Sequence, residues 1–457
     1  MKSEKVLAGS DPSWQELADL HRKAVYDVLC RNLPYLDSLL ESLSADDYSM
    51  TFVTVLFVKM NQVYTESIKN RFEQTLSQVE SIIPFLNSSH ISFIPDIYIS
   101  LFRKVYDYYL HISKPARGIM ILSNAISLLI KDEQHTITSL HPCLFCLCLK
   151  ARIHDPAIPF LHLGVFKIFQ ETTNENDAYM DPKWVLLYFY YGGLLYAVLG
   201  YYRKAFLMMQ KVCCMPAVLP SHIMLQAYKK YVLFSLVLSG KASVLPSYRS
   251  AVLTRFVIPL CPDYLALEKI CESEEENFDK SGAVLEYLEA HYVVFETDKN
   301  VGLVKLVARS IRENAVKNLS RCFTSISLSD VVRRCFLNNI NHAEWYLYSM
   351  SRNGSIKVRI DKKRSLAYFD EIRVDMEDNL LDQRASKIYK LDALLKQFDD
   401  EIRTSPEFVS RILRPPARGT ASVPSDESLG HPGSVFMPNL NVGDIESAAG
   451  RPMDMVD

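Results

Sequence analysis

Residues 327–369 read SLSDVVRRCFLNNINHAEWYLYSMSRNGSIKVRIDKKRSLAYF, and this stretch decides the fold of the chain. It opens with Ser327-Leu-Ser-Asp330, a helix start signal in which a serine can cap the free backbone N–H groups of the first turn. A second helix is expected from about Asn341, because its apolar residues recur at i, i+3, i+4 and i+7. These residues are Ala343, Tyr346, Leu347 and Met350. Asn353-Gly354 should end that helix, since glycine adopts the left-handed conformation that closes many helices.

The apolar period then changes from that of a helix to that of a strand. Ile356, Val358 and Ile360 alternate with polar residues, which predicts a strand over 356–360. A polar turn at 361–364 leads into a second strand over 366–369. Two short helices followed by a β-hairpin have the outline of a winged helix. The hairpin of such a module can contact nucleic acid or another protein.

Composition points to a globular, mostly helical protein. Of its 457 residues 49% are hydrophobic, and a formal net charge of −2 gives no global attraction to nucleic acid or to an acidic membrane. The 15 glycines are too few to favour β-rich folds or glycine-loop nucleotide sites. Ten irregularly spaced cysteines and an N-terminus without an apolar run indicate reduced, buried thiols. We therefore expect a protein of the cytoplasm and nucleus.

The chain is predicted to be mostly α, with an N-terminal helical-repeat, tetratricopeptide-like solenoid. Amphipathic stretches with short, often proline-marked breaks suggest paired helices. One pair has tetratricopeptide spacing at Phe189, Gly193, Tyr196, Tyr202 and Ala205. We predict helical repeats at 1–195 and a second domain at 196–372. This second domain consists of a helical part at 196–318 and a winged helix at 319–372. A C-terminal helix at 376–411 and a disordered tail at 412–457 follow.

One uncharged stretch, Trp184–Tyr202, approaches the length needed to cross a bilayer. It holds six tyrosines and three glycines, and Lys183 and Arg203 flank it closely. No second stretch of this kind accompanies it. A buried helix in a packed array explains this composition better than a membrane span, so we expect no membrane contact.

The sequence offers no motif for catalysis. It lacks a phosphate-binding loop, a His-Glu-x-x-His pair, a nucleophile elbow and a dinucleotide-binding glycine pattern. The sharpest metal candidate is His141 with Cys143, Cys146 and Cys148, but leucines and Phe145 interleave these residues, and a helix would point Cys146 and Cys148 apart. We expect a buried core helix there, and neither an enzyme, a metal site nor a cofactor.

The predicted hairpin is basic, which makes nucleic acid the main alternative to a protein partner. Its basic residues are Lys357, Arg359, Lys362, Lys363 and Arg364. However, the helix at 342–351 carries no Arg, Lys, Asn or Gln to recognise base edges. A solvated turn and protein contact are therefore favoured over nucleic acid.

The predicted C-terminal helix carries an apolar seam. Its residues are Leu381, Ile388, Leu395 and Ile402 at seven-residue intervals, with Leu391 and Phe398 between them. Only Arg384 interrupts the pattern. A 3.5-residue apolar period makes a helix pack along another helix. The seam can dock on its own domain or, at least as plausibly, enter an intermolecular bundle.

Several stretches resemble one branch of the PCI-domain family, the subunit 3 family of the COP-9 signalosome. They are Tyr188–Gly193, Ser221–Tyr231, Arg255–Leu260, Gly302–Lys305, Ser325–Asp330 and Asp399–Ile402. The resemblance runs from about His141 to Val409, and it identifies the second domain as a PCI domain.

This resemblance implies a function that the residues alone do not. It implies a non-catalytic scaffold subunit of a complex that removes the ubiquitin-like modifier Nedd8 from cullins, and so regulates cullin–RING ubiquitin ligases, while the protease centre lies in another subunit. The hairpin would join a shared arc of winged helices, with its strands 356–360 and 366–369 offering an edge to the next subunit. The contact would use Ile356, Val358, Ile360, Leu366 and Tyr368. The seam residues would enter a common helical bundle. Partners would be the other signalosome subunits and, indirectly, cullin–RING ligases.

Two alternatives stay open within the PCI family. A proteasome lid subunit would differ only in its partners. A nucleic-acid-binding PCI protein, similar to some messenger-RNA export subunits, would use the basic hairpin.

Overall fold

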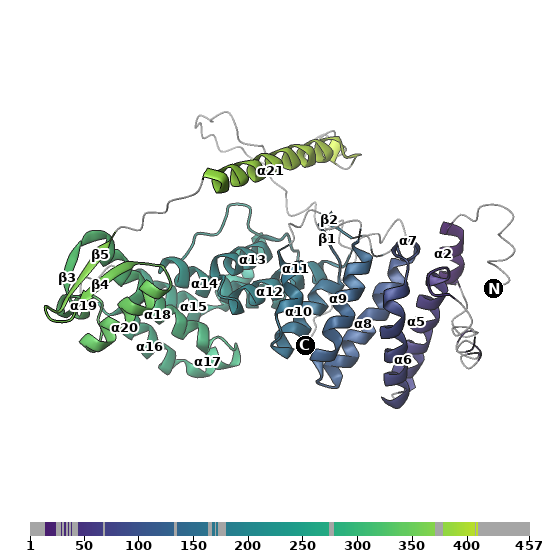
Figure 1. The fold of residues 1–457 in the computed structure, drawn as a ribbon, viewed down its shortest axis with the longest axis horizontal. Coiled ribbons are helices and arrows are strands. Elements are labelled where there is room, and N and C mark those ends of the chain that lie inside the picture. Colours follow the sequence, from purple (N-terminus) through teal and green to yellow (C-terminus); the bar gives the residue numbers. More distant parts are fainter. Residues whose placement is uncertain are drawn as a thin grey trace, which may run out of the picture. The chain divides into compact units, whose positions relative to one another are not determined.

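The computed structural model describes residues 14–23, 44–66, 69–131, 135–162, 167–169, 180–273, 278–370 and 378–406, with isolated positions near 29–38, 171 and 408–409. Its elements form two compact units that divide after Asn314. The first is an array of helices and the second contains the winged helix (Figure 1), so the predicted fold class is confirmed. The predicted tail at 412–457 lies outside the described residues.

In the first unit most helices pack against their neighbours in chain order (Figure 1). The long helices are α2 (Trp14–Lys23), α5 (Ser49–Glu66), α6 (Lys69–Ile82), α8 (Pro95–His111), α9 (Pro115–Leu129), α10 (Leu140–Ala151), α12 (Pro182–Val198), α13 (Tyr202–Cys214), α14 (His222–Ser239), α15 (Pro262–Glu272), α16 (Lys280–Ala290) and α18 (Val301–Cys322). The short helices are α7 (Ser88–Ile91), α11 (Ile158–Leu161) and α17 (Tyr292–Thr297), and a π-helical turn spans Leu253–Val257. A two-residue parallel pair, β1 (Thr136–Ile137) and β2 (Lys167–Ile168), was not expected from the sequence.

Local chemistry explains where these helices begin and end. Four of them start at a proline, whose missing N–H is not needed in the first turn. Asp181 caps α12 by accepting from the backbone N–H of Lys183, and Ser221 caps α14 in the same way. Gly240 ends α14 at a φ of +69°, a conformation that costs glycine little.

The predicted tetratricopeptide-like pair forms α12 and α13. Gly193 lets the two helices approach closely, because a Cβ there would lie 2.7 Å from Cε of Met209 and 3.4 Å from the carbonyl oxygen of Ala205. The predicted boundary at 195/196 falls inside α12, and one continuous core runs from Leu17 to Ala308. Among the described residues, no helix is both long and apolar enough to span a membrane.

A partly buried polar network ties α14, α15 and the end of α17 together. The Asp298 carboxylate accepts from Nζ of Lys229 at 2.7 Å, from the hydroxyl of Tyr264 at 2.8 Å and from Nε2 of Gln226 at 3.3 Å. The amide of Asn300 donates to the same tyrosine hydroxyl at 2.8 Å. Burial raises the pKa of Asp298, but the three hydrogen bonds outweigh it, and the pKa lies below its ordinary value of 3.8.

The second unit contains a three-stranded antiparallel sheet and the helices around it. After the last turns of α18 come β3 (Ser325–Ser327), α19 (Leu328–Arg334), α20 (Ile340–Arg352), β4 (Lys357–Asp361), β5 (Leu366–Asp370) and α21 (Asp378–Thr404). The strand order is β3-β5-β4. A separate core joins the sheet to α19 and α20, and it includes Val316, Ile326, Leu328, Val331, Leu347, Ile356, Ala367 and Phe369.

We predict that Asp298→Asn lowers the free energy of unfolding by about 3 kcal/mol, because it leaves the partly buried Lys229 ammonium without its counter-charge. The carboxylate has a lower pKa in the folded than in the unfolded state. Its stabilising contribution is therefore present above about pH 4 and is lost as the pH falls through the folded-state pKa. Urea unfolding of the full chain at pH 7 and pH 3.5 measures both effects.

Glu289→Gln is the matched control, since it removes the same charge from an exposed position of α16. Equal stability of the two variants at pH 7 would contradict the role given to the network.

Candidate protein-interaction site

In the winged helix, the predicted start of α19 and the predicted end of α20 both form. Ser327 caps α19, with its hydroxyl accepting from the backbone N–H of Asp330 at 3.1 Å. The four predicted core positions of α20 are all buried, and its C-terminal glycine, Gly354, has a φ of +68°. The helix predictions of this module are therefore confirmed.

The open edge of the sheet differs from the expectation. The sequence predicts a two-stranded hairpin with both strands available, but β3 pairs with β5 through Ser325↔Tyr368, Ile326↔Ala367 and Ser327↔Leu366. The β5 strand is therefore central and paired on both sides, so the prediction that 366–369 offers an edge is wrong. Within this sheet the longer free edge belongs to β4.

The predicted hairpin residues separate onto the two faces of the sheet. Ile356 precedes β4 and is only 3% exposed, so its side chain is held in the core of this chain. Val358 and Ile360 are partly buried on the inner face. The side chains of Leu366 and Tyr368 lie on the opposite face, where Tyr368 is paired with Arg359. The structure thus does not bring these five side chains into one patch.

Acidic neighbours partly neutralise the basic hairpin. Lys362 pairs with Glu344 of α20 at 3.3 Å, and Arg359 pairs with Asp370 at 3.0 Å. Asp361 lies 4.0 Å from Arg364 and also holds the turn by accepting from the backbone N–H groups of Lys363 and Arg364. The cationic side chains of these pairs are exposed and each pair contributes little to stability, so a partner could exchange them at small cost.

One face of α20 presents residue types common at protein interfaces. Its exposed positions at i, i+4, i+7 and i+11 are Asn341, Trp345, Tyr348 and Arg352. Tyr348 is 74% exposed and Trp345 51% exposed, although Trp345 also packs edge-on against Tyr346 with ring centroids 5.1 Å apart. Trp, Tyr and Arg contribute disproportionately to binding energy when a partner covers them.

A groove of about 420 Å³ runs between α20 and the free edge strand β4. Its lining residues are Glu344, Tyr348, Ser351, Arg352, Val358, Ile360 and Lys362. The sequence pointed to Val358, Ile360 and Lys362, but Tyr348 and Arg352 were not predicted as interface residues. Their seven- and eleven-residue offsets from Asn341 could have shown a shared outward face.

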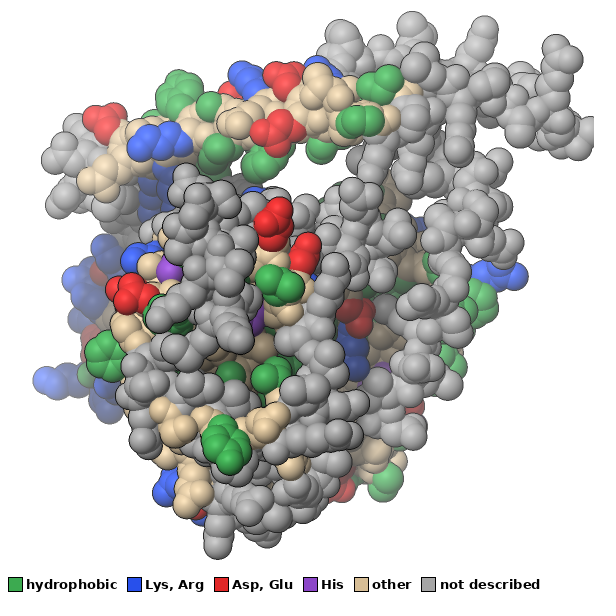
Figure 2. Space-filling view, turned by 90° about the vertical axis from the view of Figure 1, so that its right-hand side faces the viewer, with side chains coloured by type: hydrophobic (Ala, Val, Ile, Leu, Met, Phe, Trp, Pro, Cys, Tyr) green, Lys and Arg blue, Asp and Glu red, His purple; other side chains and the backbone are tan. Residues whose placement is uncertain are grey.

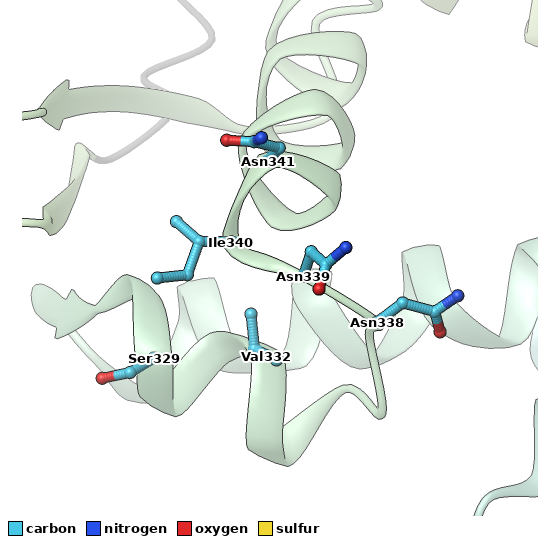
Figure 3. Close-up of a pocket in the computed structure, with 6 residues that line it drawn as sticks. All are labelled: Ser329, Val332, Asn338, Asn339, Ile340 and Asn341. Carbon is cyan, nitrogen blue, oxygen red and sulfur yellow. The ribbon is translucent and has the colours of Figure 1, made fainter.

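A second depression, of about 370 Å³, lies where α19 faces the start of α20 (Figure 3). Ser329 and Val332 come from α19, and Asn338, Asn339, Ile340 and Asn341 come from the turn and first residues of α20. Ile340 lies over the side of α19 in this view. The lining offers amides and one hydroxyl but no general acid, general base or cation, so it lacks the groups of a catalytic site.

The seam of α21 is largely exposed. Leu381, Ile388, Leu391, Leu395 and Ile402 are 40–65% exposed, while Phe398 is partly buried. Figure 2 shows hydrophobic side chains along this helix among acidic and basic ones. Among the described residues the predicted helix is present as α21, whereas 376–377 and 410–411 lie outside them, and its use as an interface stays a prediction.

The cysteine-rich helix is a core helix, as predicted. His141, Cys143, Cys146 and Cys148 are all buried in α10. Nδ1 of His141 lies 2.8 Å from the hydroxyl of Thr138, and the Cys143 thiol donates to the carbonyl of Ser139 at 3.3 Å. Burial raises the pKa of Cys143 well above its ordinary value, which keeps the thiol protonated. Among the described residues, no three His, Cys, Asp or Glu side chains are arranged to hold a metal ion.

A helical array leading into a winged helix, followed by a long helix, is the arrangement of a PCI-domain protein, and a PCI-domain family model matches residues 288–371. A second family model, described as COP9 signalosome complex subunit 3, N-terminal helical repeats, matches residues 11–253. The chain belongs to the COP9 signalosome subunit 3 family.

Two curated relatives agree with this assignment. The COP9 signalosome complex subunit 3 of Drosophila melanogaster is 28% identical over 418 residues, which cover 88% of this chain and 91% of the relative. The subunit 3 of Dictyostelium discoideum is 26% identical over 415 residues, which cover 89% of this chain and 94% of the relative. Both matches extend over nearly the whole of each protein.

The exposure pattern of α20 predicts that alanine substitutions at two adjacent residues change the free energy of unfolding by very different amounts. Leu347→Ala should lower the free energy of unfolding by about 2–5 kcal/mol, because Leu347 is fully buried. Tyr348→Ala should change it by less than about 0.5 kcal/mol, since an exposed side chain loses few contacts. Thermal unfolding of the two single variants compares them directly. A large loss for Tyr348→Ala would mean that this side chain supports the fold and is not free for a partner.

Proposed function

We propose that this chain is a non-catalytic scaffold subunit of the COP9 signalosome. In this role it supports the removal of Nedd8 from cullins, and so the regulation of cullin–RING ubiquitin ligases, in the cytoplasm and nucleus. The protease centre would lie in another subunit. Family membership supports the complex, and the surfaces described above support a role in holding subunits together.

The observation that carries this proposal is the exposed seam of α21. An apolar stripe with a period of 3.5 residues is suited to a neighbouring helix. Its members Ile388 and Leu395 are 65% and 60% exposed in the isolated chain. Leaving such side chains in water is unfavourable by about 1.5–3 kcal/mol each relative to burial, so a bundle with helices of other subunits would gain considerably from them.

The edge of β4 supplies a second surface of a different kind. Alternate residues of an edge strand direct backbone N–H and C=O groups away from their own sheet, and these groups can pair with another chain. Arg359 and the turn at 362–364 place charges along this edge, which discourages unspecific pairing. We propose that a neighbouring winged helix of the complex meets the chain here.

Binding to nucleic acid is less well supported. The outward face of α20 presents aromatic residues where a DNA-reading helix needs groups that recognise base edges. A protein partner uses these aromatic side chains better.

The double variant Ile388→Asp with Leu395→Asp should leave the chain folded and release it from the complex. Placing two charges in an apolar helix interface costs several kcal/mol, and every 1.4 kcal/mol reduces affinity tenfold. Co-purification of the other subunits with the tagged full chain should fall at least tenfold, while the unfolding temperature stays unchanged.

The matched control is Ser386→Asp with Ala393→Asp. These positions are also seven residues apart, but they lie on the side of α21 opposite the seam. Retention of the complex by the seam variant, or equal loss with the control, would overturn the bundle assignment.

A further inference from the structure

The winged helix and the C-terminal end of the same chain have opposite charge. Residues 315–370 contain ten Lys and Arg and four Asp and Glu, a formal charge of +6. Residues 421–457 contain one Arg and six Asp and Glu, a formal charge of −5. This difference is hidden in the whole chain, whose formal net charge is −2. The acidic segment is therefore complementary to the module that carries the groove between α20 and β4.

The groove is apolar in the middle and carries charged side chains towards its ends, with Arg352 at one end and the Lys362–Glu344 ion pair at the other. Val358 and Ile360 line it from β4, and Tyr348 lines it from α20. The ion pair between Lys362 and Glu344 shows that the hairpin end of β4 lies beside the first half of α20. Arg352, the last residue of α20, also lines the groove, and Lys363 follows Lys362 in the exposed turn. A suitable occupant is an extended segment with apolar and acidic side chains.

The sequence 439–446, NLNVGDIE, has this pattern. In an extended chain alternate side chains share one face, so Leu440 and Val442 would lie on the same face as Asp444 and Glu446. Its apolar half matches the middle of the groove, and its acidic half matches the basic turn at 362–364. The other face carries Asn439, Asn441 and Ile445.

The segment is also within reach of the groove. Residues 410–438 can span at most about 100 Å when extended, whereas the 27 residues of α21 measure about 40 Å. The chain can therefore return from the far end of α21 whichever way that helix points.

We propose that residues 439–446 dock in cis in the groove between α20 and β4 as an added edge strand. Leu440 and Val442 cover Val358 and Ile360. The carboxylates of Asp444 and Glu446 pair with the ammonium groups of Lys362 and Lys363. The docked segment blocks the edge of β4 until a neighbouring subunit displaces it. The free subunit is thereby protected from edge-to-edge association.

The test is hydrogen–deuterium exchange of β4 in the isolated full chain, outside any complex. Asp444→Lys with Glu446→Lys should raise the exchange rate of the β4 amides that point away from β5 about tenfold. Lys362→Glu with Lys363→Glu should do the same. Combining the four substitutions restores opposite charges across the contact and should restore the protection. Raising the salt concentration from 0.05 M to 0.5 M should weaken the protection of the β4 amides in the unmodified chain.

The matched control is Lys317→Glu with Arg321→Glu. It makes the same change of charge at exposed positions of α18 in the same unit, away from β4, and should leave the protection intact. Unchanged exchange in both charge-reversed variants, or failure of the fourfold variant to restore protection, overturns the proposal. Protection that disappears on dilution assigns the groove to the tail of a second copy and overturns docking in cis. None of these results depends on the proposed assembly, since no other subunit is present.

Discussion

The strand order β3-β5-β4 is the constraint on which the rest of the winged helix depends. Because β3 occupies one side of β5 and β4 the other, both hydrogen-bonding sides of β5 are used inside the chain. The inner face of the sheet is covered as well, since Ile326, Ala367 and Phe369 belong to the core shared with α19 and α20. The backbone edge that remains for a partner is chiefly that of β4, and α20 lies beside it.

The two units use their polar and apolar groups differently. In the helical array, charged groups such as Asp298 and Lys229 are partly buried and paired, and one continuous core fills the space between helices. In the second unit, exposed ion pairs surround a free strand edge, and a heptad seam lies in solvent. Groups that are satisfied internally hold a fold together, whereas groups left open favour association. This contrast is the physical basis for the proposal that the second unit makes the contacts with other subunits.

Much of this arrangement could be predicted because it rests on local patterns. The cap at Ser327, the buried face of α20 and the glycine at 354 each follow from residue types at short spacing. The strand β3 could not be predicted, because three residues show no usable period and their pairing with 366–368 depends on the tertiary fold. The same strand determines that β5 is central, so the error about the open edge followed directly. The groove was missed because its two walls come from different elements.

Native mass spectrometry of the complex purified through this chain tests the central claim most directly. The account predicts one copy of the chain together with the other signalosome subunits, including the one that carries the protease centre. It also predicts that this assembly removes Nedd8 from a cullin. Recovery of the chain with proteasome lid subunits instead, or on its own from gentle lysates, would contradict the account.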